Sequence, residues 1–253
     1  MSLGLPTQIR SSLQAQAFPI PSSAWIESAL PNRNPLPPLP ALVATIKTRL
    51  LAVDLTTPGL LEAPAPAFPA NLVNPEVTEI KLAEDIPVQV LDVENLSRSK
   101  WEQVEELEAI ARGEQTKGRE IVRLPIRNAA DGDDDEDGAG EDTAAGRSSG
   151  SAAASAAAAA RANANATHRL VLQDCQGQKV HGVELKRIER VGVGVLNIGE
   201  KMMLRRGATV ARGVVLLEPA TCAVLGGKVE AWQRAWLDSR LARLKEAVGA
   251  DAA

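Results

Sequence analysis

The sequence predicts an α+β protein in which short N-terminal helices precede a small five-stranded β-barrel, with a long insertion after the first strand and a C-terminal helix. Three observations support this prediction. Prolines punctuate short apolar stripes in the first third of the 253 residues, apolar and polar residues alternate in short runs after Ile86, and the tail has an apolar stripe at helical spacing. We therefore expect helices at both ends of the chain and a barrel between them.

The N-terminal helical region is predicted for residues 1–57. Ser22 supplies the cap of a short helix that Pro31 ends, and a second helix is expected from about Pro40 to Val53, where apolar residues recur at helical spacing. The Pro/Ala-rich stretch at 58–79 is predicted to be a linker over the surface, because dense prolines prevent a regular helix or a central strand.

The barrel domain is predicted for residues 80–228. Its first strand lies near 86–91, and the later strands are expected where alternation returns, in the runs 169–174, 179–185 with its continuation 201–204, 208–217 and 221–225. Short strands joined by tight turns indicate a closed antiparallel barrel, and Gly213 within the run 208–217 predicts a bulge or a sharp bend. Residues 229–253 are expected to form a helix whose apolar stripe comprises Trp232, Trp236, Leu241, Leu244 and Val248.

The insertion is predicted to span residues 95–167. It begins with a helix, because Ser99 and Glu102 fit a capping box and Gly113 ends the apolar face. Eight acidic residues follow within 131–142, and then eleven alanines between 152 and 166. We expect disorder over 128–167, since this part has little apolar surface to bury.

Composition argues against an enzyme and against a cofactor. Cys175 and Cys222 are isolated, so neither a disulfide framework nor a zinc site is expected, and both are interpreted as reduced, buried side chains. The GxG at 192–194 lacks the third glycine of a dinucleotide loop, and the acidic run 133–137 is interpreted as a solvated tract. With no signal peptide and no apolar run that would span a bilayer, a soluble, intracellular protein is expected, with no membrane partner.

Several segments then resemble one family, the RecQ-mediated genome instability protein 1 family, in its OB (oligonucleotide/oligosaccharide-binding) domain. The resemblance covers residues 80–232 and is most specific in 212–230; its other segments are 86–92, 100–120, 169–174, 183–184 and 199–201. The resemblance implies an OB-fold barrel that follows three helices in the chain. It also implies a nuclear, non-catalytic subunit that acts in DNA repair, replication and homologous recombination.

The resemblance also implies partners and a contact surface. The partners are topoisomerase III, a RecQ-type helicase and, as a further candidate, a second small OB-fold subunit; the role is dissolution of double Holliday junctions and decatenation. In this family the inserted loop docks at the topoisomerase gate, which assigns the contact to residues 95–125. The residues assigned to it are Arg98, Lys100, Trp101, Val104, Glu105, Leu107, Glu108, Lys117, Arg119 and Ile121.

The alternative is that the barrel binds single-stranded nucleic acid. Residues 168–227 carry 9 basic and 5 acidic side chains, against 9 and 15 in 93–167, and the candidate phosphate contacts are Lys186, Arg187, Arg205 and Arg206. However, residues 169–227 contain no Phe, Tyr or Trp on which bases could stack, so only weak or indirect nucleic-acid binding is expected. Trp101 has two interpretations, an interface anchor or a side chain packed back onto the barrel.

Overall fold

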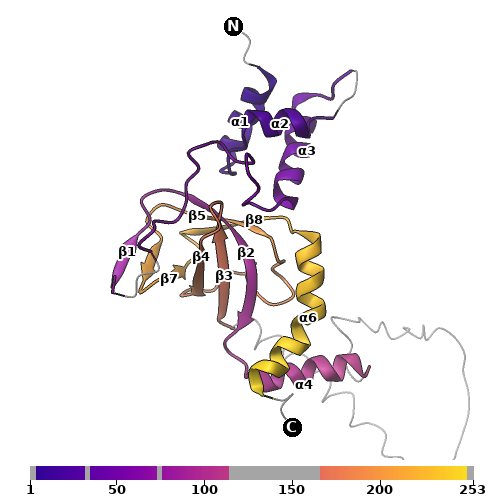
Figure 1. The fold of residues 1–253 in the computed structure, drawn as a ribbon, viewed down its shortest axis with the longest axis vertical. Helices are drawn as coiled ribbons and strands as arrows, with labels where there is room; N and C mark the ends of the chain where they lie inside the picture. The colour runs from indigo at the N-terminus through magenta and orange to yellow at the C-terminus, as the bar shows by residue number, and fades with distance from the viewer. Residues whose placement is uncertain (1–3, 32–34, 73–75, 114–165, 250–253) are drawn as a thin grey trace, which may run out of the picture.

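The computed structural model describes residues 4–31, 35–72, 76–113 and 166–249. The helices at the N-terminus stand at one end of a curled sheet, the C-terminal helix runs along the side of the sheet, and the remaining helix lies at the other end (Figure 1). The helices are α1 (Leu5–Ala15), α2 (Ser23–Ala29), α3 (Leu39–Ala52), α4 (Lys100–Ala111) and α6 (Glu230–Val248). The strands are β1 (Glu79–Lys81), β2 (Ile86–Asn95), β3 (His168–Asp174), β4 (Lys179–Glu184), β5 (Lys201–Leu204), β6 (Thr209–Ala211), β7 (Val214–Leu217) and β8 (Cys222–Gly226).

The N-terminal helices share a small apolar core of their own. Ile9 and Leu13 of α1 pack with Ile26 of α2 and Ile46 of α3. The Ser22 hydroxyl accepts the Trp25 N–H at 3.1 Å, so this cap is confirmed. We did not predict α1, although its proline in the first turn and the spacing of Ile9 and Leu13 are typical of an amphipathic helix.

The Pro/Ala-rich stretch at 58–79 differs from the linker that was predicted over the surface. Leu60 is buried beside the end of α3, and Phe68 and Leu72 belong to the core of the barrel. The backbone N–H of Phe68 donates to Asp174 at 2.8 Å, so the stretch is also hydrogen-bonded to the end of β3. Leu60, Phe68 and Leu72 therefore anchor a segment whose other described residues are exposed or half-buried.

Within the described residues, the sheet has eight strands in the order β1-β6-β7-β4-β3-β2-β5-β8, and β4 pairs with β7 in parallel. The predicted number of five strands is therefore not confirmed, and the antiparallel direction holds for every strand pair of the described residues except β4 and β7. The predicted run 208–217 divides into β6 and β7, because Arg212 and Gly213 both have positive φ, 47° and 79°. Two such residues make a two-residue hairpin turn, where we had predicted a bulge or bend.

The curl of the sheet comes from the chain between Val214 and Gly226. Its first part, β7, pairs with β4, whereas its second part, β8, pairs with β5 on the other side of β2. This segment thus joins two distant strands of the sheet and wraps it around one apolar core, which includes Val88, Leu172 and Val215.

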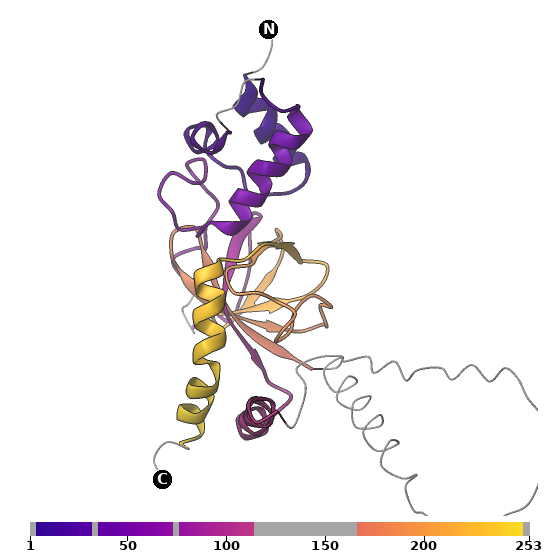
Figure 2. The ribbon, with the colours of Figure 1, turned by 90° about the vertical axis from the view of Figure 1, so that its right-hand side faces the viewer.

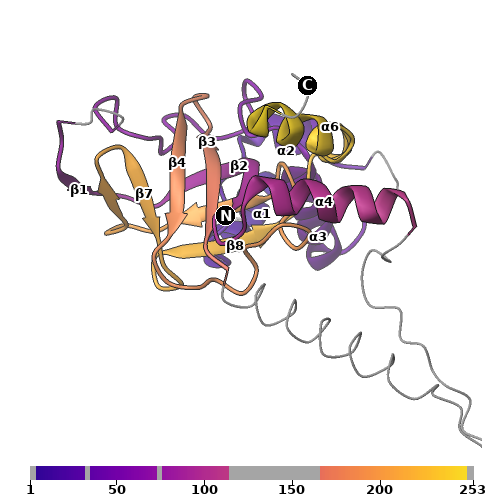
Figure 3. The same ribbon diagram turned by 90° about the horizontal axis from the view of Figure 1, so that it is seen from below.

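α6 packs along the side of the barrel and then runs on to α4, as two perpendicular views show (Figures 2 and 3). Trp236 is buried in the barrel core and Trp232 packs partly against it, so the predicted core role of this stripe is confirmed at Trp236. None of the helices that the structure describes is long and apolar enough to cross a membrane.

Candidate functional site

The candidate docking surface is built on α4, the helix with which the insertion begins. The Ser99 hydroxyl accepts the Glu102 N–H at 3.1 Å, and the Glu102 carboxylate accepts the Ser99 N–H at 2.9 Å. This capping box, which was predicted, fixes the start of the helix. Of the residues assigned to the contact, Lys117, Arg119 and Ile121 lie outside the part of the chain that the structure describes.

Trp101 lies on the solvent side of α4. Its side chain is 53% exposed, and its indole Nε1–H donates to Glu105 one turn along the helix at 2.9 Å. The interpretation in which Trp101 packs back onto the barrel does not fit this geometry. Because its polar edge has a partner while the ring faces solvent, the side chain is held ready for an apolar contact.

The other assigned residues divide into an outward and an inward group. Lys100 and Glu105 are exposed beside Trp101, whereas Val104 is buried and Leu107 is half-buried. Gln103, which we did not assign, is buried and donates to the main-chain oxygens of Asn95 and Arg98, both at 3.3 Å. The inward residues therefore support the helix, and the outward residues form the candidate contact surface.

α6 packs against α4 and forms a half-exposed ion pair with it. Lys245 lies 2.8 Å from Glu108, and this hydrogen bond lowers the pKa of Glu108 below its usual value. Within the α4 segment, Arg98 pairs with Glu106 at 2.6 Å. α4 is thus held between the end of β2 and the last turns of α6.

Trp236 anchors α6 to the barrel at this end of the molecule. Its indole N–H donates to Asp92 at 2.5 Å, and Arg240 and Arg243 each lie 5.5 Å from the centre of its ring. The role of Asp92 was not predicted, since 144 residues separate it from Trp236 and only the folded chain brings the two together.

A buried cluster fixes the strand that follows the insertion. His168 Nδ1 lies 2.7 Å from Glu184, whose other oxygen accepts from Arg187 at 2.9 Å and from the Ile188 N–H at 3.0 Å. Burial alone would raise the pKa of Glu184, but the His168 hydrogen bond, the Ile188 N–H and the Arg187 charge together lower it. Sequence gave no signal for this cluster.

The four basic residues proposed for phosphate contact do not form one patch. Lys186 and Arg187 follow β4 near the end of the sheet where Asn95 pairs with His168, whereas Arg205 and Arg206 follow β5 near Ile86, at the other end of β2. Lys186 also pairs with Glu218 at 3.1 Å, and Arg187 is bound to Glu184. The barrel therefore offers separated charges in place of a continuous basic groove.

The described residues also show how the cysteines and acidic side chains are placed. Cys222 is buried, and burial raises the pKa of its thiol to about 12, whereas Cys175 is half-buried. Among the residues described, no three His, Cys, Asp or Glu side chains are grouped so that they could hold a metal ion.

Comparison with known proteins identifies the family. Residues 68–240 match the family model described as RMI1, N-terminal OB-fold domain. A stretch of 73 residues is 34% identical to the RecQ-mediated genome instability protein 1 of Schizosaccharomyces pombe, and it covers 29% of this chain and 30% of that protein. The shared stretch thus spans under a third of the relative. Because the family model covers well over half of the chain, including every strand of the sheet, the chain belongs to the RMI1 family and its curled sheet is the OB fold of that family.

Proposed function

We propose that this chain is a non-catalytic adaptor in genome maintenance that binds topoisomerase III and a RecQ-type helicase. In this role it promotes decatenation and the dissolution of double Holliday junctions. Membership of the RMI1 family supports the role in genome maintenance, since the name of the fission-yeast relative refers to RecQ-mediated genome instability. The insertion that begins with α4 is the proposed contact with the topoisomerase.

The observation that carries this proposal is the exposure of Trp101 on a helix that is otherwise well fixed. Tryptophan is enriched among the residues that dominate binding energy at interfaces, and an anchor binds best when its own conformation is set in advance. The capping box, the buried Gln103 and Val104 and the Lys245 pair set the position of α4 before any partner binds.

Single-stranded nucleic-acid binding has less support. The strands carry no aromatic side chain for stacking between Arg169 and Gly227, and the basic residues lie at opposite ends of the barrel. Electrostatic contacts alone give weak binding that falls steeply with salt.

The test compares Trp101→Ala with Leu36→Ala in binding to topoisomerase III. Both residues are 53% exposed, but Leu36 lies just before α3, and Figure 1 shows α3 at the opposite end of the sheet from α4. Loss of an anchoring Trp costs about 2 kcal/mol or more, so Trp101→Ala should weaken binding at least tenfold, with slower decatenation, while Leu36→Ala changes neither. Equal binding by both variants would remove α4 from the proposed contact.

A further inference from the structure

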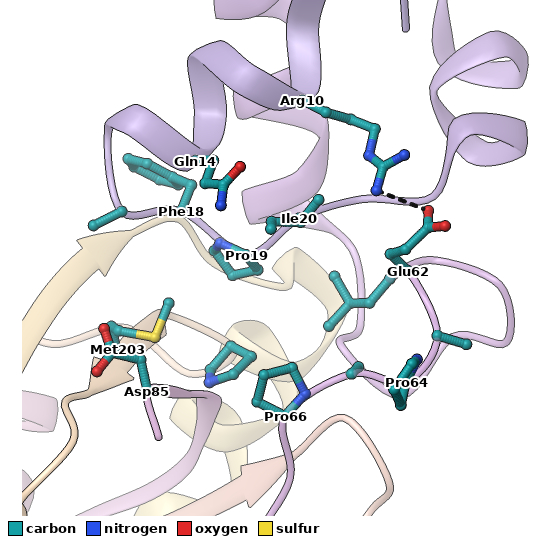
Figure 4. A pocket seen from close by; sticks show the side chains of 15 residues that line it. Arg10, Gln14, Phe18, Pro19, Ile20, Glu62, Pro64, Pro66, Asp85 and Met203 are labelled. Carbon is teal, nitrogen blue, oxygen red and sulfur yellow. Dashed lines mark ion pairs between the residues drawn. The ribbon is translucent and has the colours of Figure 1, made fainter. Parts of the chain in front are cut away.

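Lys201 of β5 is a buried cation at the contact between the barrel and the N-terminal region. It pairs with Gln89 of β2 on one side and with Gly226 of β8 on the other, and it is 1% exposed. Met203, two residues along β5 and therefore on the same face, lines the pocket between the barrel and the turn after α1 (Figure 4). The N-terminal region thus covers the face of β5 on which Lys201 lies.

The ammonium group of Lys201 is poorly compensated for a buried charge. Within the described part of the chain its Nζ donates to one acceptor, the main-chain oxygen of Gly199 at 2.6 Å, and it forms no ion pair. An ammonium has three donors and is expensive to bury without a paired charge. The fold therefore disfavours the charged form of this side chain.

Asp54, just after α3, is the charged group of the N-terminal region that acts on Lys201. Burial lowers the pKa of Lys201 from its ordinary value of 10.5 to about 8, and the charge of Asp54 offsets only part of this effect. Asp54 Oδ1 already accepts hydrogen bonds from Gln89 at 2.7 Å and from the Thr56 N–H at 2.9 Å. The other charged side chains around Lys201, on the turn before β5 and at the start of α6, belong to ion pairs of their own: Glu200 with Arg190 at 3.0 Å, and Lys228 with Glu230 at 2.7 Å.

The effect is reciprocal at the carboxylate. Burial alone would raise the pKa of Asp54, but the hydrogen bonds from Gln89 and Thr56 and the charge of Lys201 together lower it. An electrostatic interaction therefore joins the N-terminal region to β5, in addition to the hydrogen bonds of Gln89.

We infer that Lys201 is a pH-sensitive element in the contact between the barrel and the N-terminal region. While the side chain is protonated, the contact carries the cost of a buried charge, which separation of the two parts would return to water. Loss of the proton in mildly alkaline solution removes this cost, so the contact becomes stronger as the pH rises. This inference concerns the chain alone and does not depend on the proposed function.

The direction follows from proton binding in the two states. In the unfolded chain Lys201 has its ordinary pKa of 10.5, whereas in the folded chain the pKa is about 8. Between these values the unfolded chain binds more protons, so the stability of the fold rises with pH in this window.

The first measurement follows the ¹³Cε signal of Lys201 by NMR in the full, lysine-labelled chain. We expect its titration to have a midpoint near pH 8. Asp54→Asn should move this midpoint to lower pH, because it removes the offsetting charge and keeps the acceptor oxygen for Gln89. A midpoint near 10.5, or one that Asp54→Asn leaves unchanged, would overturn the inference.

The second measurement compares urea unfolding of the wild type and Lys201→Met at pH 7 and pH 9. Relative to the variant, the ratio of folded to unfolded wild type should rise about tenfold between these pH values. Burial also raises the pKa of the Cys222 thiol to about 12, but both proteins share this group, so its effect cancels.

Lys186→Met is the matched control, since the side chain of Lys186 is 68% exposed, and its stability should follow that of the wild type between the two pH values. Equal pH dependence of the wild type and Lys201→Met would overturn the inference. If Lys201→Met does not fold, the NMR titration decides alone.

Discussion

The two ends of the barrel are held to their helices by different kinds of contact. At the end near the N-terminal helices, Gln89 is fully buried and donates to Asp54 at 2.7 Å and to Gln173 at 3.0 Å, and its oxygen accepts the Leu55 N–H at 2.8 Å. At the other end, α4 is held by a capping box, by the buried Val104 and Gln103, whose amide donates only to main-chain oxygens close in sequence, and by exposed or half-exposed ion pairs.

This difference separates the structural joint, by which we mean the buried contacts of Gln89 between the N-terminal region and the barrel, from α4, which lies on the surface. A buried polar network with every partner in place fixes one geometry, whereas exposed ion pairs contribute little free energy. Close packing adds to the joint, since a Cβ at Gly227 would lie 2.4 Å from the Leu51 carbonyl oxygen. The N-terminal helices and the barrel are thus joined by buried contacts between segments far apart in the sequence, whereas α4, the proposed contact with a partner, is held mainly by its own flanking residues and by α6.

The largest expected effect is on the structural joint. Gln89→Leu leaves the Leu55 N–H without its buried acceptor and removes a donor from Asp54. The free energy of unfolding in urea at pH 7 should fall by about 3 kcal/mol, because each buried unsatisfied group costs roughly 1–3 kcal/mol. Glu105→Gln on the exposed face of α4 is the control and should change it by less than about 0.5 kcal/mol. Similar losses in the two variants would contradict the contrast between the ends.

A smaller, pH-dependent effect is expected for Glu184→Gln. The folded protein lowers the pKa of Glu184, so its carboxylate stabilises the fold above the ordinary value of 4.5, and this contribution is lost as the pH falls through the lowered pKa. The substitution should cost about 2 kcal/mol at pH 7, since hydrogen bonds to charged groups contribute roughly 1.5–3 kcal/mol. The difference in the free energy of unfolding between the variant and the wild type should become smaller below pH 4.5. Urea unfolding at pH 7, 5 and 3.5 measures this difference in the free energy of unfolding. A difference that stays constant with pH would show that the charge of Glu184 does not stabilise the fold.

The smallest effect is expected for the exposed support of α4. Lys245→Met removes the ion pair with Glu108, in which both side chains are about one-third exposed. The free energy of unfolding should change by about 0.5 kcal/mol or less, and the change should shrink further in high salt. Thermal melts at two salt concentrations measure this. A loss of unfolding free energy as large as that of Gln89→Leu would mean that α4 contributes to stability as much as the buried contacts of Gln89 do.

The sequence was informative where a signal is local and much less so where contacts join distant segments. The capping box of α4, the stripe of α3 and Trp236 in α6 follow from spacing within one helix, and the structure agrees with each. The pairing of β4 with β7 and the contact between Asp92 and Trp236 depend on how the chain folds back, which periodicity does not encode. The buried hydrogen bonds of Gln89 to Asp54 and Leu55 likewise join segments that only the folded chain brings together.

The most direct test of the adaptor role is a pull-down of the full chain against topoisomerase III at low and moderate salt, with labelled single-stranded DNA as a parallel ligand. We predict topoisomerase binding that survives moderate salt and is weakened by Trp101→Ala, together with weak, salt-sensitive DNA binding. Tight DNA binding without retention of topoisomerase III would contradict the account and favour a nucleic-acid-binding role for the barrel.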